Sequence, residues 1–216
     1  MARLPRMVAP GCAHLVIQRG HPGRPIFRDD ADRETYLRML RDAAGTGQVA
    51  LHAFALADNE VLLVATPPDA PALSRLMQAV GRHYVSAYNR RHGGSGTLWD
   101  GRFRCGVLES GPTLLRALHL VDSAPGRTSA PHRAGGPRET FLADPAEYWQ
   151  LGNTPFEREA AYRTLLGHPL PPAEAQRLRA AALGGWVAGS REFAEALAAA
   201  AGRPAQPRPR GRPRKS

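Results

Sequence analysis

Residues 49–65 read VALHAFALADNEVLLVA, and this stretch decides the fold. In its first half, apolar side chains occupy every second position, which is the period of a β-strand that buries one face: Val49, Leu51, Ala53 and Ala55. The Asp58-Asn59 pair favours a turn, and a second apolar run follows it. The stretch therefore predicts a β-hairpin with strands at residues 49–56 and 61–65, in which positions 60 and 62 share one face.

The segments on either side of the hairpin extend this pattern. Residues 14–19, HLVIQR, and residues 103–108 are short apolar runs that predict strands. Apolar residues at three- and four-residue spacing predict a helix from Asp29 or Asp30 to about Ala44, and a longer helix over residues 71–91. The order strand, helix, strand, strand, helix, strand indicates an α+β protein with a ferredoxin-like βαββαβ sandwich.

The composition changes along the chain and predicts four regions. A short helix at residues 113–121 follows the last strand, and residues 123–137 are rich in Pro, Gly and Ala, as loops are. Helical patterns return after residue 145, and the end of the chain is rich in Pro and Arg, so we expect it to be disordered when free. The expected regions are a folded domain at 1–128, a linker loop at 129–144, a helical extension at 145–202 and a basic tail at 203–216.

The charge of the chain favours a polyanionic partner. The formal net charge is +10, from 29 basic and 19 acidic residues. Lys215 is the only lysine, and the abundance of Arg, Ala, Gly and Pro is also what a GC-rich genome produces. Codon usage accounts for arginine in place of lysine, but it does not account for the excess of basic over acidic residues. We therefore expect nucleic acid as the partner.

Other features exclude several classes of protein. No apolar run approaches the roughly 20 residues that span a bilayer. The arginines near the N-terminus are not followed by an apolar signal-peptide core, so we expect a cytoplasmic, nucleoid-associated protein. Cys12 and Cys105 are too few for a disulfide scaffold, and neither lies in a CxxC motif.

Four segments resemble the REP-associated tyrosine transposases, single-strand DNA enzymes of the histidine–hydrophobic–histidine (HUH) class. They cover nearly the whole chain, and the long helix with its exit loop is the most specific of them. The family has the ferredoxin-like sandwich that the periodicity predicts. The matching residues are RLPRMVAPG at 3–11 with HLVIQRG at 14–20 and PIFRDD at 25–30; LHAFAL at 51–56 with NEVLLVATP at 59–67; LSRLMQ at 73–78 with YNRRHG at 88–93 and GTLWDGRF at 96–103; and GNTPFEREAAYR at 152–163 with GRPRK at 211–215.

The resemblance also implies which residues would cut DNA. In the family, two histidines at positions i and i+2 of a strand hold Mg²⁺ or Mn²⁺, and a tyrosine attacks the phosphodiester. Here Glu60 and Leu62 occupy the histidine positions and Leu120 occupies the tyrosine position. Leucine has no nucleophilic or metal-ligating atom. We therefore expect a catalytically degenerate member with no intact catalytic residue, no metal site and no cofactor.

Two groups of residues are candidates for DNA contact. The first group lies on the long helix and its exit loop, where arginines would bind phosphates and an aromatic ring would stack on a base: Arg75, Arg82, Arg90, Arg91, Trp99, Arg102 and Arg104. The alternative is that Trp99 fills the core and the arginines are a solvated face. The second group is the basic tail, whose RGRP resembles the minor-groove core of an AT-hook, although a generic polyanion-binding tail has the same composition: Arg210, Arg212, Arg214 and Lys215.

The sequence thus predicts a DNA-binding protein of the transposase family without cleavage activity. Its expected partner is single-stranded or hairpin DNA, with A·T-rich duplex as a further partner of the tail, and no membrane. One alternative is an active single-strand DNA transposase that uses non-standard residues, Tyr84, Tyr88 or Tyr148 among them. Another is an RNA-binding module. The oligomeric state is left open.

Overall fold

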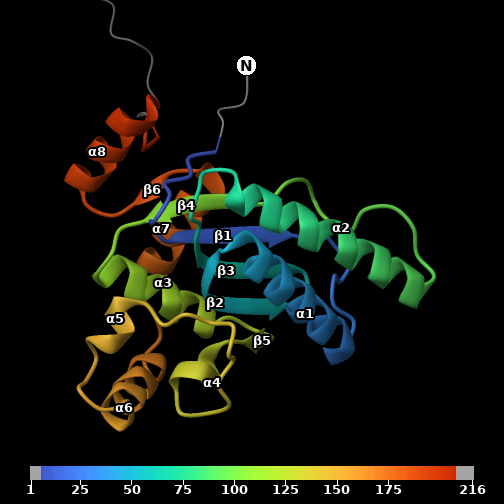
Figure 1. Ribbon diagram of the computed structural model, residues 1–216, viewed down its shortest axis with the longest axis horizontal. Coiled ribbons are helices and arrows are strands. Elements are labelled where there is room, and N and C mark those ends of the chain that lie inside the picture. The colour runs from blue at the N-terminus through green and yellow to red at the C-terminus, as the bar shows by residue number, and fades with distance from the viewer. Residues whose placement is uncertain (1–5, 208–216) are drawn as a thin grey trace, which may run out of the picture.

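The computed structural model describes residues 6–207 (Figure 1). Six strands form one mixed sheet, and helices lie on both of its faces, so the protein belongs to the α+β class as expected. The elements in chain order are β1 (His14–Arg19), α1 (Asp30–Gly47), β2 (Ala50–Ala57), β3 (Glu60–Thr66), α2 (Ala72–His92), β4 (Arg104–Leu108), α3 (Pro112–Asp122), β5 (Arg127–Thr128), α4 (Ala130–Arg133), α5 (Ala146–Trp149), α6 (Pro155–Leu166), α7 (Pro172–Gly184), β6 (Val187–Ala188) and α8 (Arg191–Ala201).

The strand order confirms the ferredoxin-like sandwich. The order is β5-β2-β3-β1-β4-β6, so the four central strands follow the antiparallel arrangement that the βαββαβ pattern requires. The expected hairpin is present: β2 pairs with β3 in antiparallel register, with Leu56 opposite Val61 and Ala57 opposite Glu60. The short strands β5 and β6 extend the sheet at its two edges, antiparallel to β2 and parallel to β4.

The alternation expected along β2 is interrupted. The register of β2 against β3 shifts between Leu51 and Ala53, which marks a β-bulge. As a result Leu51 joins the core on one face of the sheet, whereas Ala53 and Ala55 join the core on the other. The expectation of one shared face for these residues was therefore wrong, because the extra residue, His52, changes the phase of the two-residue period.

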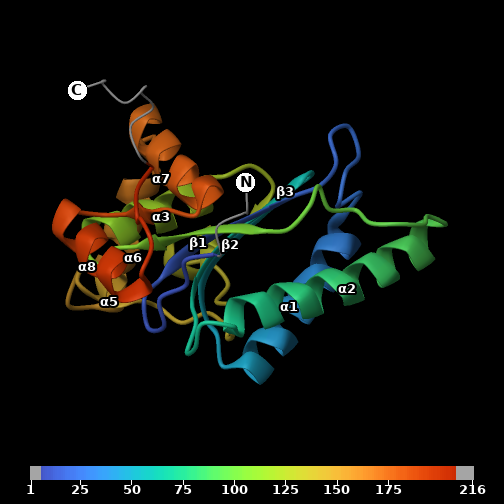
Figure 2. The ribbon, with the colours of Figure 1, turned by 90° about the horizontal axis from the view of Figure 1, so that it is seen from above.

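The first face of the sheet is covered by α1 and α2 (Figure 2). Asp29 caps α1 by accepting a hydrogen bond from the backbone N–H of Asp32, at one of the two positions where the sequence predicted the helix to begin. Both helices bury one stripe of side chains, and these meet the sheet in a single core. The buried residues include Tyr36, Leu37, Leu40 and Ala44 of α1, and Leu73, Leu76, Met77, Val80, Tyr84 and Tyr88 of α2.

The opposite face is covered by α3 and α7 (Figure 2). Leu114, Ala117, Leu118 and Val121 of α3 and Leu178, Ala181 and Ala182 of α7 form its core with alternate residues of the strands. Gly106 of β4 makes this packing close, because a Cβ there would lie 2.7 Å from the carbonyl oxygen of Trp186 and 3.0 Å from the backbone of Ala181. Helix α7 therefore lies directly on the sheet.

Two segments expected to be loop or tail are packed instead. Residues 129–144 include α4, whose Arg133 is fully buried. The Arg133 guanidinium pairs with Asp122 and Asp144, which offsets the cost of burying its charge.

The start of the tail also packs against the fold. Ala205 is 4% exposed and its carbonyl accepts a hydrogen bond from the backbone N–H of Val187, while Arg203 lies over the Trp186 ring. The first residues of the tail are therefore part of the fold, because the Ala205 side chain packs beside β6. None of the helices within residues 6–207 is long and apolar enough to cross a membrane.

Candidate nucleic-acid interface

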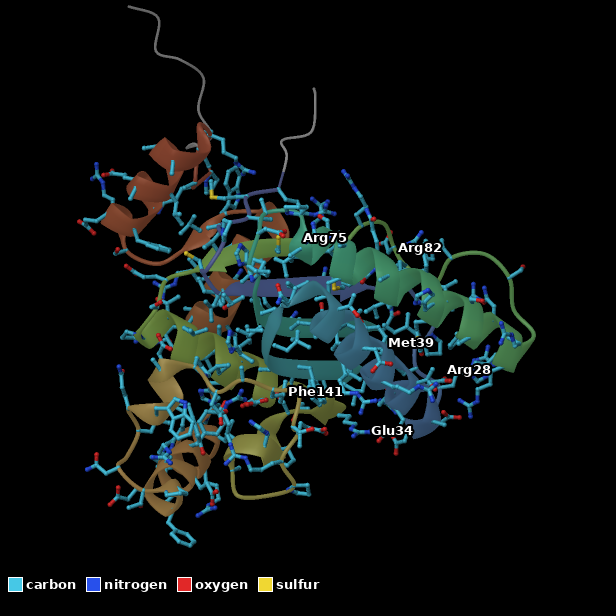
Figure 3. All side chains as sticks on the ribbon, in the orientation of Figure 1. Arg28, Glu34, Met39, Arg75, Arg82 and Phe141 are labelled. Atoms are coloured by element: carbon cyan, nitrogen blue, oxygen red, sulfur yellow. The ribbon has the colours of Figure 1, made fainter. Side chains whose placement is uncertain are left out.

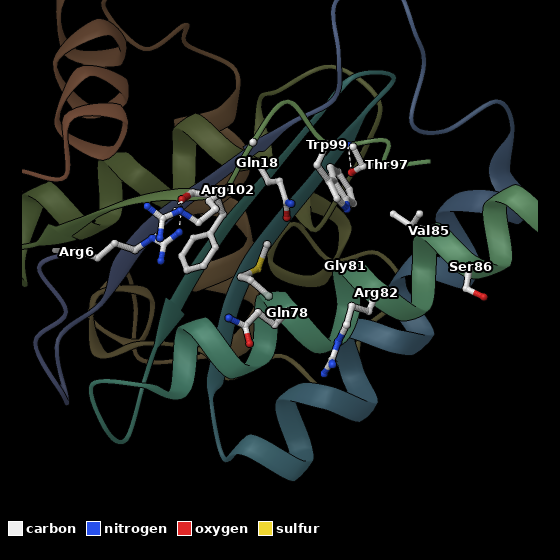
Figure 4. Close-up of a pocket in the computed structure, with 13 residues that line it drawn as sticks. Arg6, Gln18, Gln78, Gly81, Arg82, Val85, Ser86, Thr97, Trp99 and Arg102 are labelled. Carbon is white, nitrogen blue, oxygen red and sulfur yellow. Dashed lines mark hydrogen bonds between the residues drawn. The ribbon is translucent and has the colours of Figure 1, made fainter. Parts of the chain in front are cut away.

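A groove with a volume of about 530 Å³ lies between α2, β1 and the exit loop that leads from α2 to β4 (Figure 4). One stripe of α2 forms one wall, at the spacing of successive helical turns. Gln18 of β1 and Trp99 of the exit loop extend toward α2 from the other side (Figure 4). The residues that line the groove are Arg6, Gln18, Met77, Gln78, Gly81, Arg82, Val85, Ser86, Thr97, Trp99, Gly101, Arg102 and Phe103. We call this set the groove.

Backbone hydrogen bonds hold the exit loop beside β1. Helix α2 ends at Gly93, whose φ of 64° lies in the left-handed region, so the chain can turn back. The backbone N–H of Asp100 donates to the carbonyl of Arg19, and that of His21 donates to the carbonyl of Leu98. Trp99 forms an isolated β-bridge with Gly20. These bonds fix the loop, and the wall it provides is therefore preformed.

Two arginines that line the groove have no carboxylate partner among residues 6–207. Arg82 on α2 and Arg102 on the exit loop are exposed and make no ion pair with any residue between 6 and 207. Figure 3 shows Arg82 on the outer side of α2. Arg6, by contrast, donates to the carbonyl of Phe103 and stacks on its ring at 3.9 Å. The rim of the groove thus presents two cations without a protein counter-ion, an arrangement suited to phosphate.

Two other arginines of the expected set support the fold instead. Arg75 pairs with Asp69 at 2.8 Å. Arg91 pairs with Asp29 at 2.6 Å and with Asp32 at 2.5 Å, tying the end of α2 to the start of α1. The hydrogen bond from the Arg91 guanidinium holds the pKa of the Asp29 carboxyl well below its usual range. Their charge is therefore partly neutralised by carboxylates of the chain itself.

Trp99 is a core residue, as the alternative interpretation held. Its side chain is part of the α1–α2 core, and the residue is 8% exposed. The ring lies 6.4 Å from that of Tyr36 and 6.2 Å from that of Tyr84. The expectation that its face stacks on an exposed base was wrong, because aromatic neighbours occupy that space. Only its edge contributes to the groove.

The remaining expected contacts do not all lie on one surface. Arg90 is exposed on α2, near its C-terminal end. Arg104 begins β4 on the side of the sheet that also carries Gly106 and Leu108, because side chains alternate along a strand, and Leu108 belongs to the α3–α7 core. Arg104 therefore lies on the opposite face from the groove. The tail residues Arg210, Arg212, Arg214 and Lys215 lie outside the described residues.

The positions at which the resemblance places catalytic residues lie on the α3–α7 face. Leu62 of β3 is 2% exposed in the core beneath α3 and α7. Leu120 of α3 is partly buried and packs against the same core. We call Leu62, Leu120 and the covering residues Leu178, Ala181 and Ala182 the sealed face. These side chains carry no polar atom, so they provide neither a metal ligand nor a nucleophile.

Glu60 lies at the edge of this face and is held by two cations. It accepts from Arg19 at 2.8 Å and from Arg179 of α7 at 2.7 Å, and its side chain is 20% exposed. Glu60 and Leu62 share one side of β3, as the sequence predicted, since both face α7. A single carboxylate already paired with two guanidinium groups, beside a buried leucine, does not fit a divalent cation. Nor is there any cluster of three or more His, Cys, Asp or Glu side chains with metal-site geometry within residues 6–207.

Every tyrosine of the chain is buried. The five residues are between 0 and 2% exposed: Tyr36, Tyr84, Tyr88, Tyr148 and Tyr162. The hydroxyl of Tyr84 donates to the carbonyl of Ile26, and that of Tyr88 donates to the carbonyl of Pro25. Burial raises the pKa of the hydroxyl of Tyr84 and of Tyr148. A phosphodiester cannot approach these oxygens in this structure.

Sequence reasoning did not single out most residues of the groove, Gln18 and Gly81 among them. Gln18 is the one amide in the apolar strand HLVIQR, and it is 6% exposed. Gly81 stands inside α2, where glycine costs about 1 kcal/mol relative to alanine. Each is a local departure from the pattern of its element, and such departures are where a functional position is expected.

Comparisons with known proteins found similar solved structures but no matching family. No family model matches the sequence, and no curated protein matches it. One similar solved structure is a REP-associated tyrosine transposase bound to a REP hairpin, with a TM-score of 0.48 and 10% identity over 56% of this chain and 70% of that one. Another is a candidate transposase from Deinococcus radiodurans R1, with a TM-score of 0.39 and 18% identity over 50% of this chain and 88% of that one. At this low identity and overlap, the comparisons do not assign a function. The function has to be inferred from the residues of the chain itself.

Proposed function

We propose that this protein binds single-stranded or hairpin DNA through the groove and does not cleave it. The observation that carries the proposal is the pair of exposed arginines, Arg82 and Arg102, which flank a largely apolar groove and have no counter-ion among the described residues. Phosphate binding by arginine supplies most of the affinity of such proteins and makes it depend on salt. The formal net charge of +10 favours the same partner.

The absence of cleavage is supported by the sealed face. Cleavage through a tyrosine would need a nucleophile in contact with phosphate, and all five tyrosines are buried. The family's metal would need ligands at positions 60 and 62, where an arginine-paired carboxylate and a buried leucine stand. Replacing Glu60 and Leu62 by histidine should therefore not restore cleavage, since position 120 still lacks a nucleophile.

The tail is proposed as a second DNA contact. Arg210, Arg212, Arg214 and Lys215 lie in a Pro-rich sequence whose RGRP suits the narrow minor groove of A·T-rich duplex. A chain that ends at residue 207 keeps the contacts of Arg203 and Ala205, so it separates the contribution of the tail from that of the fold. Its affinity for A·T-rich duplex should fall more than its affinity for G·C-rich duplex.

The proposal is tested with a fluorescent hairpin that carries a single-stranded extension, incubated with the protein and Mg²⁺ or Mn²⁺. We expect saturable binding that weakens with salt, and no covalent product on a denaturing gel. A 5′-phosphotyrosyl adduct would contradict the proposal and establish an active transposase. Tighter binding to the matched RNA would favour an RNA-binding module, and no binding to either would rule out nucleic acid as the partner of the groove.

A further inference from the structure

The groove contains two buried polar groups that the fold leaves without partners. The indole Nε1 of Trp99 and the side-chain oxygen of Gln18 are both inaccessible to solvent and have no hydrogen-bond partner among the described residues. Their residues are 8% and 6% exposed, and both line the groove (Figure 4). Buried donors and acceptors are satisfied in the great majority of cases, so an unpaired donor and an unpaired acceptor in one groove indicate an absent ligand.

The polar, apolar and charged side chains of the groove indicate which class of ligand it binds. Trp99 offers one donor, and the amide of Gln18 offers an acceptor or, after rotation, a donor. Met77, Val85 and Phe103 supply apolar walls. Arg82 and Arg102 stand exposed at the rim. A planar group with donors and acceptors on its edge, joined to phosphate, matches this set. That description fits a nucleotide.

Gly81 keeps the floor of the groove open. A Cβ at this position would lie 3.4 Å from Nε1 of Trp99, in van der Waals contact with the indole edge. An alanine would therefore cover the donor without a clash against the backbone. Glycine is unfavourable inside a helix, and its presence here leaves the space beside the Trp99 N–H without a side chain.

We propose that the groove receives one unpaired base of a bound DNA strand, with Trp99 Nε1 and the Gln18 amide contacting the edge of the base and Arg82 and Arg102 contacting the flanking phosphates. This inference rests on the proposed function. The base comes from a strand rather than from a free nucleotide, because two arginines at the rim match the two phosphates that flank a nucleotide within a chain. A paired base cannot enter, since its edge is occupied by its partner.

The groove volume agrees with this occupant. About 530 Å³ lies in the range of small-ligand sites and exceeds the need of one base, but it does not admit a duplex. The donor and the acceptor are held on the exit loop and on β1, which are joined by backbone hydrogen bonds, so the backbone positions of both are fixed before a strand binds. We expect it to favour unpaired strands over duplex of equal charge.

The test is a thermodynamic cycle between Gly81→Ala and loss of the base. Fluorescence anisotropy is measured with a hairpin that has an unpaired loop, with the same hairpin made abasic in the loop, and with a blunt duplex of equal length. The abasic strand keeps every phosphate, so it isolates the contribution of the base. Gly45→Ala is the matched control, because Gly45 lies in α1, and a Cβ there meets no atom within 4 Å.

We expect the wild type and Gly45→Ala to bind the unpaired loop about tenfold more tightly than the abasic loop, in keeping with the energy of one bound base. Gly81→Ala should bind both loops equally, at the level of the wild type with the abasic loop. Gln18→Met, which removes the acceptor at similar size, should lose part of the preference. Thermal melting of each variant checks that the fold is intact.

Other outcomes overturn the inference in distinguishable ways. Equal affinity of the wild type for the unpaired and abasic loops would contradict the base site and leave DNA binding standing. No affinity for any of the DNAs would contradict the proposed function itself. A free deoxynucleoside monophosphate that binds as tightly as the strand, measured by calorimetry, would show that the ligand is a soluble nucleotide, contrary to the proposal.

Discussion

The two faces of the central sheet differ in how completely their covering helices close them. On the α3–α7 face, apolar side chains of α7 lie directly on the strands, and Leu62 and Leu120 become part of a core. On the α1–α2 face, α2 and the exit loop leave a groove with two polar groups and, at its rim, two arginines that have no partner among residues 6–207. The comparison teaches that a closed apolar core and an open groove can lie on the two sides of one sheet, since each face is packed independently.

Two glycines have opposite consequences on the two faces. Gly106 lets the backbone of α7 approach β4, because a Cβ there would lie 3.0 Å from the backbone of Ala181. Gly81 leaves space beside the edge of Trp99, which a Cβ at 3.4 Å from Nε1 would fill. Absence of a side chain therefore closes one face and opens the other. The predictions below separate the roles of these faces, from the largest expected effect on stability to the smallest.

Truncation on the sealed face should destabilise the protein most. Leu62→Ala removes a buried side chain between β3 and the helices above it and should lower the free energy of unfolding by about 2–5 kcal/mol. Urea denaturation measures this effect. DNA affinity per folded molecule should not change, since Leu62 lies away from the groove. A mutant with unchanged stability would show that α7 does not seal this face.

Acidification should destabilise the fold through His14 of β1, the strand shared by both faces. Burial lowers the pKa of His14 to about 4, and the ring is neutral, because its Nε2 accepts from the backbone N–H of Ala9. The unfolded state binds a proton near pH 6.5 and the folded state only near pH 4. Stability is therefore complete above pH 6.5 and falls toward pH 4, by roughly 3 kcal/mol.

The contribution of His14 is isolated with His14→Gln, followed by urea denaturation between pH 4 and pH 7. Burial also lowers the pKa of His52 and of His119, so the wild type should lose stability through all three histidines. The mutant should show a shallower dependence on pH than the wild type. Parallel curves for the two proteins would contradict the role given to His14.

The two glycines should respond to alanine with opposite signs. Gly106→Ala places a Cβ against the backbone of α7 and should lower the free energy of unfolding by about 1–3 kcal/mol. Gly81→Ala has room and removes a helix-breaking residue, so it should raise that free energy by about 0.5–1 kcal/mol. Thermal and urea unfolding of the two variants measure both changes in the free energy of unfolding. If both substitutions changed the free energy of unfolding in the same direction, the distinction between a closed and an open face would not hold.

Neutralising the rim of the groove should leave stability unchanged. Arg82→Ala combined with Arg102→Ala should shift the free energy of unfolding by less than about 0.5 kcal/mol, since neither side chain has an ion-pair partner among the described residues. Binding of single-stranded DNA should weaken, and the slope of log K against log salt should flatten by roughly 0.7 for each lost phosphate contact. Arg75→Ala, which breaks the pair with Asp69, is the matched control and should keep the slope.

The sequence was sufficient for the central architecture and insufficient for the site. Periodicity located the hairpin of β2 and β3 and the buried stripe of α2, because each follows from local spacing of apolar residues. It did not reveal the bulge at His52, which depends on pairing with β3. Nor did it distinguish Arg82 from Arg91, since only the fold places carboxylates beside the latter. The buried position of Trp99 follows from ring contacts between distant segments.

The proposal that the groove binds DNA is tested most directly by hydrogen exchange of the intact protein with and without a hairpin that has an unpaired loop. We predict slower exchange in the exit loop, residues 97–103, and along the neighbouring stripe of α2, with no change in α3 or α7. Protection confined to α3 and α7, with unchanged exchange in the exit loop, would contradict the assignment of the groove as the DNA-binding site.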